Sequence, residues 1–285
     1  MNRLSNADRA RIVHCLVEGN SIRATCRMTG NSKGAVLRLL GDLGRVCAAY
    51  HDEHVRNVPT RRIQADEIWS FCYGKDRNIT DEKKADGAGS LWTWTGIDAD
   101  SKLIVSYLCG GRDASWARTF MEDLASRLAT RVQITTDGHS AYLEAVEGAF
   151  GIEVDYAMLI KLYGSPAAPE TRYSPGECIG IETKVKAGNP DPRHISTSYV
   201  ERQNLTMRMS MRRFTRLTNA FSKKVENHEY MLAIYFLYYN FCRVHQTLRV
   251  TPAMEAGLTH SVWTIEDMVK LMEPKSILDG LYQAA

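Results

Sequence analysis

The stretch RIQADEIWSFCYG, residues 62–74, marks the point where the chain changes from helical to extended patterning. Its polar and apolar side chains alternate, and Ile, Trp and Phe are prominent, which predicts a strand. Extended runs follow at residues 91–100, 102–111, 132–138 and 153–159, with helical runs at residues 113–131 and 139–150. Three strands before the first helix, followed by alternating helices and strands, predict an α/β domain with a mixed sheet.

Residues 1–50 show the pattern of three short helices joined by tight turns. Asn6, Ser21 and Asn31 are the expected helix caps. The pattern is typical of a helix-turn-helix DNA-binding domain. Its third helix would offer Asn31, Ser32, Lys33 and Arg38 to bases and phosphates. A structural three-helix cap without DNA contact remains the alternative.

The remaining boundaries follow from composition. Residues 51–61 contain Pro59 and no apolar period, so we expect a linker. Residues 62–258 would form the α/β domain, with an insert near residues 164–195 that carries five of the eight prolines and is expected to be mostly loop. Residues 259–285 are expected to form a C-terminal helical tail.

Charge is unevenly distributed along the 285 residues, although the net charge is only +3. Residues 1–65 hold eleven Lys and Arg against five Asp and Glu, and residues 200–250 hold nine against three, so each block carries +6 and the rest of the chain −9. Two basic blocks flanking an acidic middle suggest a polyanion partner. Solvated surface faces are the alternative explanation.

The seven cysteines are scattered and form no CxxC pair, which argues for free thiols and against a thiolate zinc site. No apolar run approaches the ~20 residues that a membrane span needs. We therefore expect a soluble, cytoplasmic protein without membrane partners.

Three carboxylates interrupt apolar or basic sequence. Asp66 lies inside the first strand, Asp137 ends the fourth, and Glu201 heads the basic stretch of residues 194–217. A strand centre, a neighbouring strand end and a packed helix could bring them to one point. Clustered carboxylates repel unless a cation neutralises them, which suits Mg²⁺ or Mn²⁺. Two such ions would support in-line displacement at a phosphodiester.

Each carboxylate also has a structural explanation. Asp137 and Gly138 form a common turn pair, and Ser198 with Glu201 matches a helix capping box. Asp66 is followed by Glu67, which would point to the opposite face of the sheet, so one of the two would be buried and the other exposed.

The helix that Glu201 begins is expected to have two faces. Asn204, Arg208 and Arg212 continue the face of Glu201, and together with Arg213 they would follow a DNA backbone. Val200, Met207, Met211 and Phe214 form a separate apolar face that is expected to pack into the core.

The sequence resembles the Asp-Asp-Glu transposases of bacterial insertion sequences, most closely those related to insertion sequence one. The resemblance covers most of residues 65–258. Its strings are ADEIWSF, WTWTGIDADSKLI, TTDGHSAY, STSYVERQNLTMRMSMRRFTRLTNAFSKK and YYNFCRVHQTLRVTPAMEAGL. Glu201 is followed seven residues later by Arg208, as in that family.

The resemblance implies a ribonuclease-H-like core and a helix-turn-helix that grips the terminal inverted repeats. It also implies divalent metal, and an oligomer, at least a dimer, that synapses two element ends in the bacterial nucleoid. Asp66 and Asp137 would bridge or flank the metals, Glu201 would complete the second ion's shell, and Arg208 would contact phosphate. Two chemical steps are implied: hydrolysis that exposes a 3′ hydroxyl, and attack of that hydroxyl on target DNA.

Two other functions remain open. A structure-specific nuclease or resolvase would use the same metal site without joining strands, and a non-catalytic DNA-binding regulator would not need the carboxylates. His139, His194 and His245 lie near the motifs, and the sequence assigns them no role.

Overall fold

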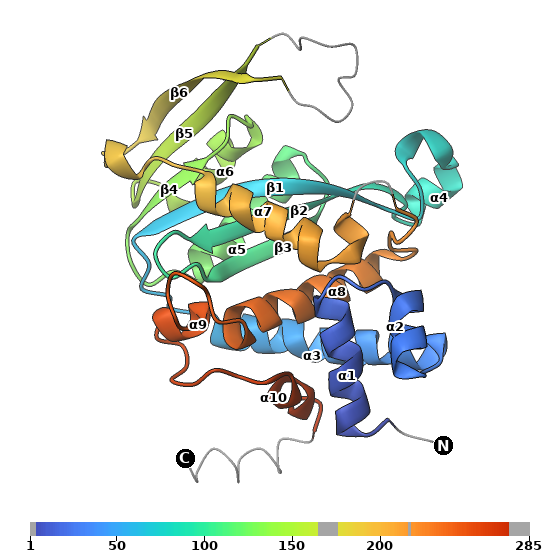
Figure 1. The fold of residues 1–285 in the computed structure, drawn as a ribbon. Helices are drawn as coiled ribbons and strands as arrows, with labels where there is room; N and C mark the ends of the chain where they lie inside the picture. Colours follow the sequence, from blue (N-terminus) through green and yellow to red (C-terminus); the bar gives the residue numbers. More distant parts are fainter. Residues whose placement is uncertain (1–3, 165–175, 216–217, 274–285) are drawn as a thin grey trace. The chain divides into compact units, whose positions relative to one another are not determined.

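The computed structural model describes residues 4–164, 176–215 and 218–273, and contains one six-stranded sheet in the order β3-β2-β1-β4-β5-β6 (Figure 1). The strands are β1 Arg62–Cys72, β2 Gly89–Asp98, β3 Ile104–Gly110, β4 Val132–Thr136, β5 Val154–Tyr163 and β6 Cys178–Ala187. β1, β4 and β5 run parallel, and β6 is antiparallel to β5. The expected mixed sheet flanked by helices is confirmed.

Helices cover the strands as the alternating pattern predicts. α5 (Ala114–Ser126) packs against β3 and against α6 (Ala141–Phe150). The expected cap Asp113 accepts hydrogen bonds from the backbone N–H groups of Ser115 and Trp116 at the start of α5. β4 is almost wholly buried, and its sequence VQITT does not alternate between polar and apolar residues, as is typical of parallel strands.

The described part of the proline-rich insert contains a strand that the sequence did not indicate. Residues 178–187 form β6, paired with β5 from Tyr156 to Tyr163. The prolines fall before and after this stretch, which contains none, and Ile179, Ile181 and Val185 occupy alternate positions as in a strand. Ile179 and Ile181 are 70% and 61% exposed, so these apolar side chains lie on a strand but are not buried in the core. Residues 165–175 lie outside the described residues.

The N-terminal region holds three helices, α1 (Asn6–Val17), α2 (Ile22–Thr29) and α3 (Lys33–His54). Ser21 caps α2 as expected, but the caps of α1 and α3 are Ser5 and Ser32 rather than Asn6 and Asn31. The Ser5 hydroxyl accepts a hydrogen bond from the backbone N–H of Asp8, and the Ser32 hydroxyl accepts one from the backbone N–H of Ala35.

α3 continues four residues beyond the expected boundary at residue 50, so the first part of the expected linker is helical. Cys47 and His51, one turn apart, are both buried, and the rings of Tyr50 and His54 stack with centroids 3.8 Å apart. These contacts extend the helix through sequence that has no apolar period.

The chain divides into two compact units. One contains residues 1–56, 68–93 and 203–285, and the other contains residues 57–67 and 94–202. In the first unit α3 packs against α8 (Val225–Leu237), and α1 packs against α10 (Ile265–Lys270). The remaining elements are η1 Asp76–Asn78, α4 Asp81–Ala85, η2 Pro192–His194, α7 Ser198–Ser210, η3 Arg212–Phe214, η4 Tyr238–Cys242 and α9 Pro252–Glu255. The domain scheme drawn from sequence stays a prediction, and residues 274–285 of the expected tail lie outside the described residues.

No helix within the described part of the chain has the length and apolar character needed to cross a membrane.

The closest approach of α3 and α8 depends on Gly44. A Cβ atom at Gly44 would lie 2.4 Å from Tyr230 Cβ and 2.7 Å from Tyr230 Cα, and backbone cannot move aside easily. We predict that Gly44→Ala lowers the free energy of unfolding by about 1–3 kcal/mol, measured by urea denaturation.

Gly41, one turn earlier on α3, is the matched control. A Cβ there meets Arg45 and Tyr230 at 3.6 and 3.7 Å, which are ordinary contacts. Gly41→Ala should therefore be neutral or stabilise by up to about 1 kcal/mol, because alanine favours helix. Equal effects of the two substitutions would contradict the packing described for α3 and α8.

Candidate active site

Strand register brings Asp66 and Asp137 together. β1 and β4 pair in parallel with Ala65 opposite Thr136, so the next residue on each strand is an aspartate at the same level. Carboxylate oxygens of Asp66, Glu67 and Asp137 lie within 4.8 Å of one another. Residues 71 positions apart in sequence therefore form one acidic cluster, entirely within the second compact unit.

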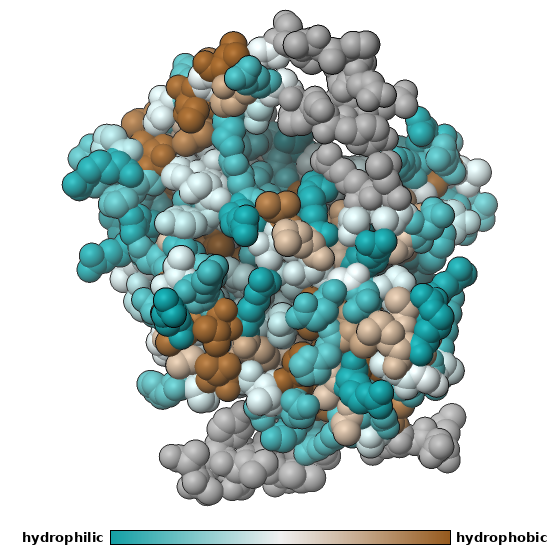
Figure 2. Space-filling model, in the orientation of Figure 1, coloured by the Kyte–Doolittle hydropathy of each residue, from teal (hydrophilic) through white to brown (hydrophobic). Residues whose placement is uncertain are grey.

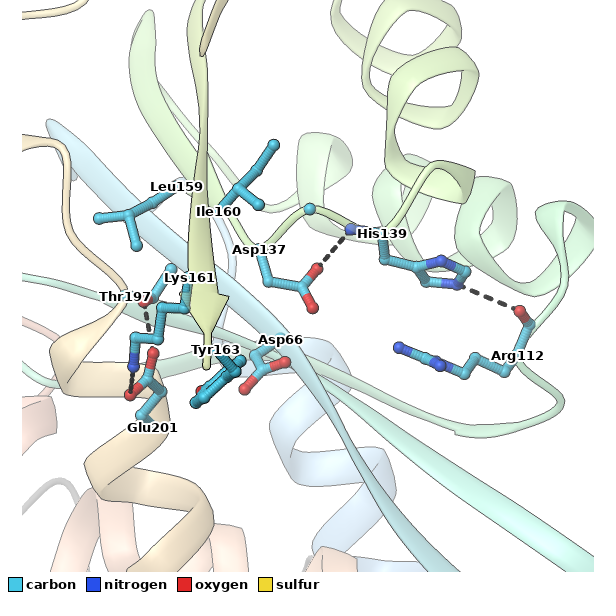
Figure 3. Close-up of a pocket in the computed structure, with 11 residues that line it drawn as sticks. Asp66, Arg112, Asp137, His139, Leu159, Ile160, Lys161, Tyr163, Thr197 and Glu201 are labelled. Carbon is cyan, nitrogen blue, oxygen red and sulfur yellow. Dashed lines mark hydrogen bonds and ion pairs between the residues drawn. The ribbon is translucent and has the colours of Figure 1, made fainter. Parts of the chain in front are cut away.

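The cluster opens into a pocket of about 510 Å³ (Figure 3). Asp66 and Asp137 line it together with Glu201, which comes from the first turn of α7. The pocket thus brings together all three carboxylates singled out in the sequence. Two cations, Arg112 and Lys161, also line it.

Asp66 is an unfavourable place for a negative charge. Burial, followed by the charges of Glu67 and Asp137, raises the pKa of Asp66 to about 7. A backbone hydrogen bond from Glu67 N–H to Asp66 Oδ1, 2.8 Å long, opposes this shift only in part. The site therefore favours either a proton or a cation beside Asp66.

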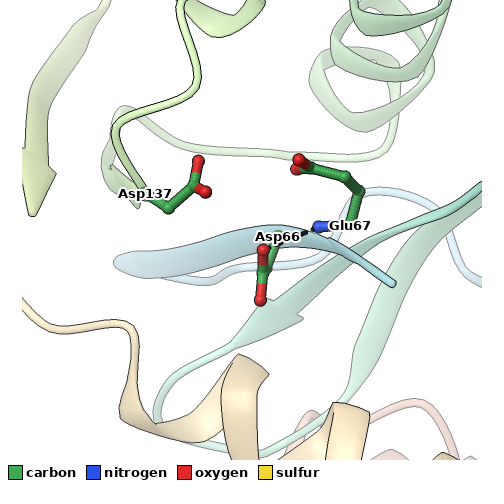
Figure 4. Close-up of side chains that lie close together, drawn as sticks. All are labelled: Asp66, Glu67 and Asp137. Carbon is green, nitrogen blue, oxygen red and sulfur yellow. Dashed lines mark hydrogen bonds between the residues drawn. The ribbon is translucent and has the colours of Figure 1, made fainter. Parts of the chain in front are cut away.

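Asp66 and Glu67 leave opposite faces of β1, as strand geometry requires (Figure 4). The Glu67 side chain is only 1% exposed. Its Oε1 accepts from Arg112 Nε at 2.7 Å, and its Oε2 accepts from the Tyr142 hydroxyl at 2.9 Å. Burial and the charge of Asp137 raise the pKa of Glu67, and Arg112 counteracts them. Glu67 was not singled out from sequence, because nothing in the sequence pairs it with Arg112 or Tyr142.

Asp137 takes part in a turn, which was the structural explanation offered from its sequence, and it also belongs to the acidic cluster. Its Oδ1 accepts from the backbone N–H of His139 at 2.9 Å, which fixes the carboxylate at the end of β4. The His139 ring lies 3.2 Å, measured from Nε2, from the carbonyl oxygen of Arg112. The turn orients the carboxylate, so the two roles are compatible.

Glu201 lines the pocket but lies outside the 4.8 Å cluster. Its carboxylate accepts hydrogen bonds from Lys161 Nζ and, at 2.5 Å, from the Thr197 hydroxyl (Figure 3). The alternative capping box is not formed, because the backbone N–H of Glu201 donates to the Thr197 carbonyl and the backbone N–H of Ser198 donates to the Ser196 hydroxyl. Lys161 thus supplies the positive charge that Glu201 faces.

Gln64 fixes the start of α7 to β1. Its side-chain oxygen accepts from the backbone N–H of Tyr199 at 2.7 Å and of Val200 at 3.2 Å. Gln64 is 3% exposed and lies two residues before Asp66, so one buried amide joins the strand of Asp66 to the first turn that carries Glu201. Buried amide bonds of this kind hold a fixed geometry because breaking them leaves unpaired polar groups.

Lys161 is a pocket residue that sequence analysis missed. It lies on β5, and the hydrogen bond and charge of Glu201 raise its pKa although burial opposes this. The signal was present in LIKLYG, where a lysine interrupts an apolar strand. That signal alone does not identify the partner, because Glu201 lies 40 residues later.

The acidic cluster could hold a metal ion. Carboxylate oxygens are the ligands that hard divalent cations prefer, and the raised pKa of Asp66 reflects an excess of negative charge that a cation would relieve. The donor set therefore fits such an ion.

The residues expected to contact DNA lie in the first compact unit. Lys33 and Arg38 are exposed on α3, whereas Ser32 caps α3 and the Asn31 amide donates to the Thr29 carbonyl. α7 ends at Ser210, so Arg212 and Arg213 belong to η3 and do not continue the helical face of Glu201 and Arg208. Val200, Met207, Met211 and Phe214 are all buried as expected, although Met211 and Phe214 follow the end of α7 and are not part of its face.

The other two histidines lie outside this pocket. His194 contacts the Arg62 guanidinium, and His245 Nδ1 lies 3.0 Å from the Thr247 hydroxyl. Neither contact assigns a chemical role.

The burial of Asp66 predicts a pH-dependent stability. Its pKa is about 7 in the folded protein and about 3.9 in an unfolded chain, so ionisation of Asp66 costs no stability below about pH 4, a growing amount between the two pKa values, and the full amount above about pH 7. Asp66→Asn should therefore raise the metal-free melting temperature by on the order of 5 °C at about pH 8, and less at about pH 5.

Asp81→Asn is the control, because Asp81 on α4 is 99% exposed.

Mg²⁺ or Mn²⁺ should raise the melting temperature of the wild type and not that of Asp66→Asn. A pH-independent difference between Asp66→Asn and the wild type would contradict the electrostatic account.

No protein-family model matches the sequence, and no curated protein does. Among solved structures, a piggyBac transposase synaptic complex with hairpin DNA is similar over 95% of this chain and 71% of its own, at 10% identity and a TM-score of 0.42. A Mos1 transposase paired-end complex is similar over 52% of this chain and 58% of its own, at 12% identity and a TM-score of 0.22. The Mos1 strand transfer complex is similar over 83% and 76%, at 12% identity and a TM-score of 0.24. TM-scores this low do not establish a shared fold, so the function proposed next rests on the site itself.

Proposed function

We propose that this protein is a DNA transposase of a bacterial insertion sequence, related to those of insertion sequence one. It would bind the ends of its element, cut them and join them to target DNA in a metal-dependent reaction. The observation that supports this most is the register of β1 and β4, which sets Asp66 beside Asp137 in a pocket that Glu201 also lines.

Asp66 and Asp137 are proposed to hold Mg²⁺ or Mn²⁺, with Glu201 completing the ligand set of a second ion. Such ions activate the attacking oxygen and stabilise the leaving oxygen at a phosphodiester. For Glu201 to act as a ligand, its carboxylate must exchange Lys161 for metal, while Thr197 and Gln64 keep the first turn of α7 in place. Lys161 and Arg112 would then face the phosphate and offset its charge.

The proposed reaction has two steps at the same site. In the first, a water oxygen bonds to phosphorus as the bond from phosphorus to the 3′ oxygen breaks, which leaves a 3′ hydroxyl on the element. In the second, that 3′ oxygen bonds to a target phosphorus and the target strand's own 3′ oxygen leaves. Joining both ends of the element to one target requires two element ends in the same complex, so we propose at least a dimer acting on double-stranded DNA in the nucleoid.

End recognition is proposed for the N-terminal helices. Lys33 and Arg38 on α3, with the neighbouring Asn31 and Ser32, would meet bases and phosphates of the terminal inverted repeats. Arg208, Arg212 and Arg213 would contact the DNA backbone.

The test is cleavage and strand transfer on labelled duplexes that carry the DNA flanking the gene, with Mg²⁺ or with EDTA. Asp66→Asn, Asp137→Asn and Glu201→Gln should each reduce joined product on the order of 100-fold or more, because each removes one charge from the proposed ligand set. Glu182→Gln is the control, since Glu182 lies on β6 and pairs with Lys184.

Metal-dependent cutting without joined product would favour a nuclease or resolvase. DNA binding with neither reaction, unchanged by the three substitutions, would leave a DNA-binding regulator. Full activity of Glu201→Gln would exclude Glu201 from the ligand set.

A further inference from the structure

A second large pocket is lined entirely by residues of the first compact unit, whereas the acidic cluster belongs to the second. This pocket has a volume of about 680 Å³ and forms a groove between α2, the first turns of α3, η3 and residues 218–227. The groove joins two regions that the sequence pointed to separately, because Lys33 from α3 and Arg212 from η3 line it together.

The charge of the groove is of one sign. Arg23, Lys33, Arg212 and Lys223 line it, and these four side chains belong to exposed residues. None of the four forms an ion pair within the described part of the chain, and the described lining residues include no carboxylate. Like charges gathered without counter-charges create a potential that attracts a polyanion.

A fifth cation is held in the wall of the groove with neutral partners. Arg213 donates from Nη1 to the Ser222 hydroxyl at 3.0 Å and to the carbonyl oxygen of Asn227. Burial lowers the pKa of Arg213 to about 10, so the guanidinium still carries its charge at neutral pH. The neighbouring His228 is neutral there, because burial and the charge of Arg213 lower its pKa to about 3. A partly buried cation without an anionic partner among the described residues is costly unless a ligand neutralises it.

The groove also has an apolar side. Leu37, Leu40 and Phe221 line it, and the Lys223 ammonium lies 4.1 Å from the centroid of the Phe221 ring. The cation–π contact holds the ammonium at the groove rather than leaving it free in solvent. The cations that line the groove could contact anionic phosphates, and its apolar residues could contact the largely apolar sugars that alternate with them in a sugar–phosphate backbone.

We propose that this groove binds the sugar–phosphate backbone of duplex DNA, with Arg23 and Lys223 as phosphate contacts beside Lys33, Arg212 and Arg213. The proposal rests on the proposed function, since it names the surface that holds the DNA. It adds two residues that the sequence did not indicate and makes one continuous surface of α2, α3 and η3.

The test measures duplex DNA binding by fluorescence anisotropy as a function of salt, in EDTA and in an Asp137→Asn background, so that no cleavage is needed. Arg23→Gln with Lys223→Gln should weaken binding 10- to 100-fold at about 0.1 M salt. It should also reduce the slope of log K against log salt by about 2, one unit for each lost phosphate contact.

The matched control is Arg27→Gln with Lys224→Gln. Arg27 lies on the same helix as Arg23, Lys224 is the neighbour of Lys223, and both are exposed residues that do not line the groove. The control pair should keep the wild-type slope. All four substituted side chains are exposed, so melting temperatures should stay within about 2 °C of the parent.

Equal losses in the groove pair and the control pair would overturn the proposal, and so would an unchanged slope in the groove pair. Failure of the proposed function is a separate outcome: the wild type would bind DNA through the groove and show neither cutting nor joining with Mg²⁺.

Discussion

The parallel register of β1 and β4 is the constraint on which the candidate site depends. It places Asp66 and Asp137 at one level on neighbouring strands, close enough that their charges oppose each other. Hydrogen bonding between the strands and burial of the sheet stabilise that register, so the carboxylates cannot separate without disrupting the sheet. The repulsion between them is therefore a fixed property of the fold and makes the pocket suited to a cation.

The neighbouring contacts can be understood as responses to this charge. Arg112 and the Tyr142 hydroxyl donate hydrogen bonds to Glu67, which belongs to the cluster, and Lys161 donates to Glu201, which lines the same pocket. The Asp137 carboxylate is oriented by its own turn. Gln64 is the link that makes the arrangement specific, because it attaches the first turn of α7 to the strand that carries Asp66.

The strands, the mixed sheet and the aspartate pair were predictable from the sequence, because alternating side chains and turn residues are local signals. It missed β6, whose apolar side chains are exposed and whose flanking prolines suggested a loop. It also continued the helix of Glu201 through Arg212, although α7 ends at Ser210. Sequence could not pair Lys161 and Arg112 with their carboxylates, or Gln64 with the backbone N–H of Tyr199, because these contacts cross 40 to 135 residues and depend on the folded sheet.

The most direct test of the central claim is a crystal structure of the protein with Mn²⁺, using the anomalous scattering of manganese to locate the ion. We expect an anomalous peak in the pocket, within about 2.2 Å of a carboxylate oxygen of Asp66 and one of Asp137, with the Glu201 side chain moved away from Lys161. A fully occupied manganese bound elsewhere, with the acidic cluster and the Lys161–Glu201 pair unchanged, would contradict it.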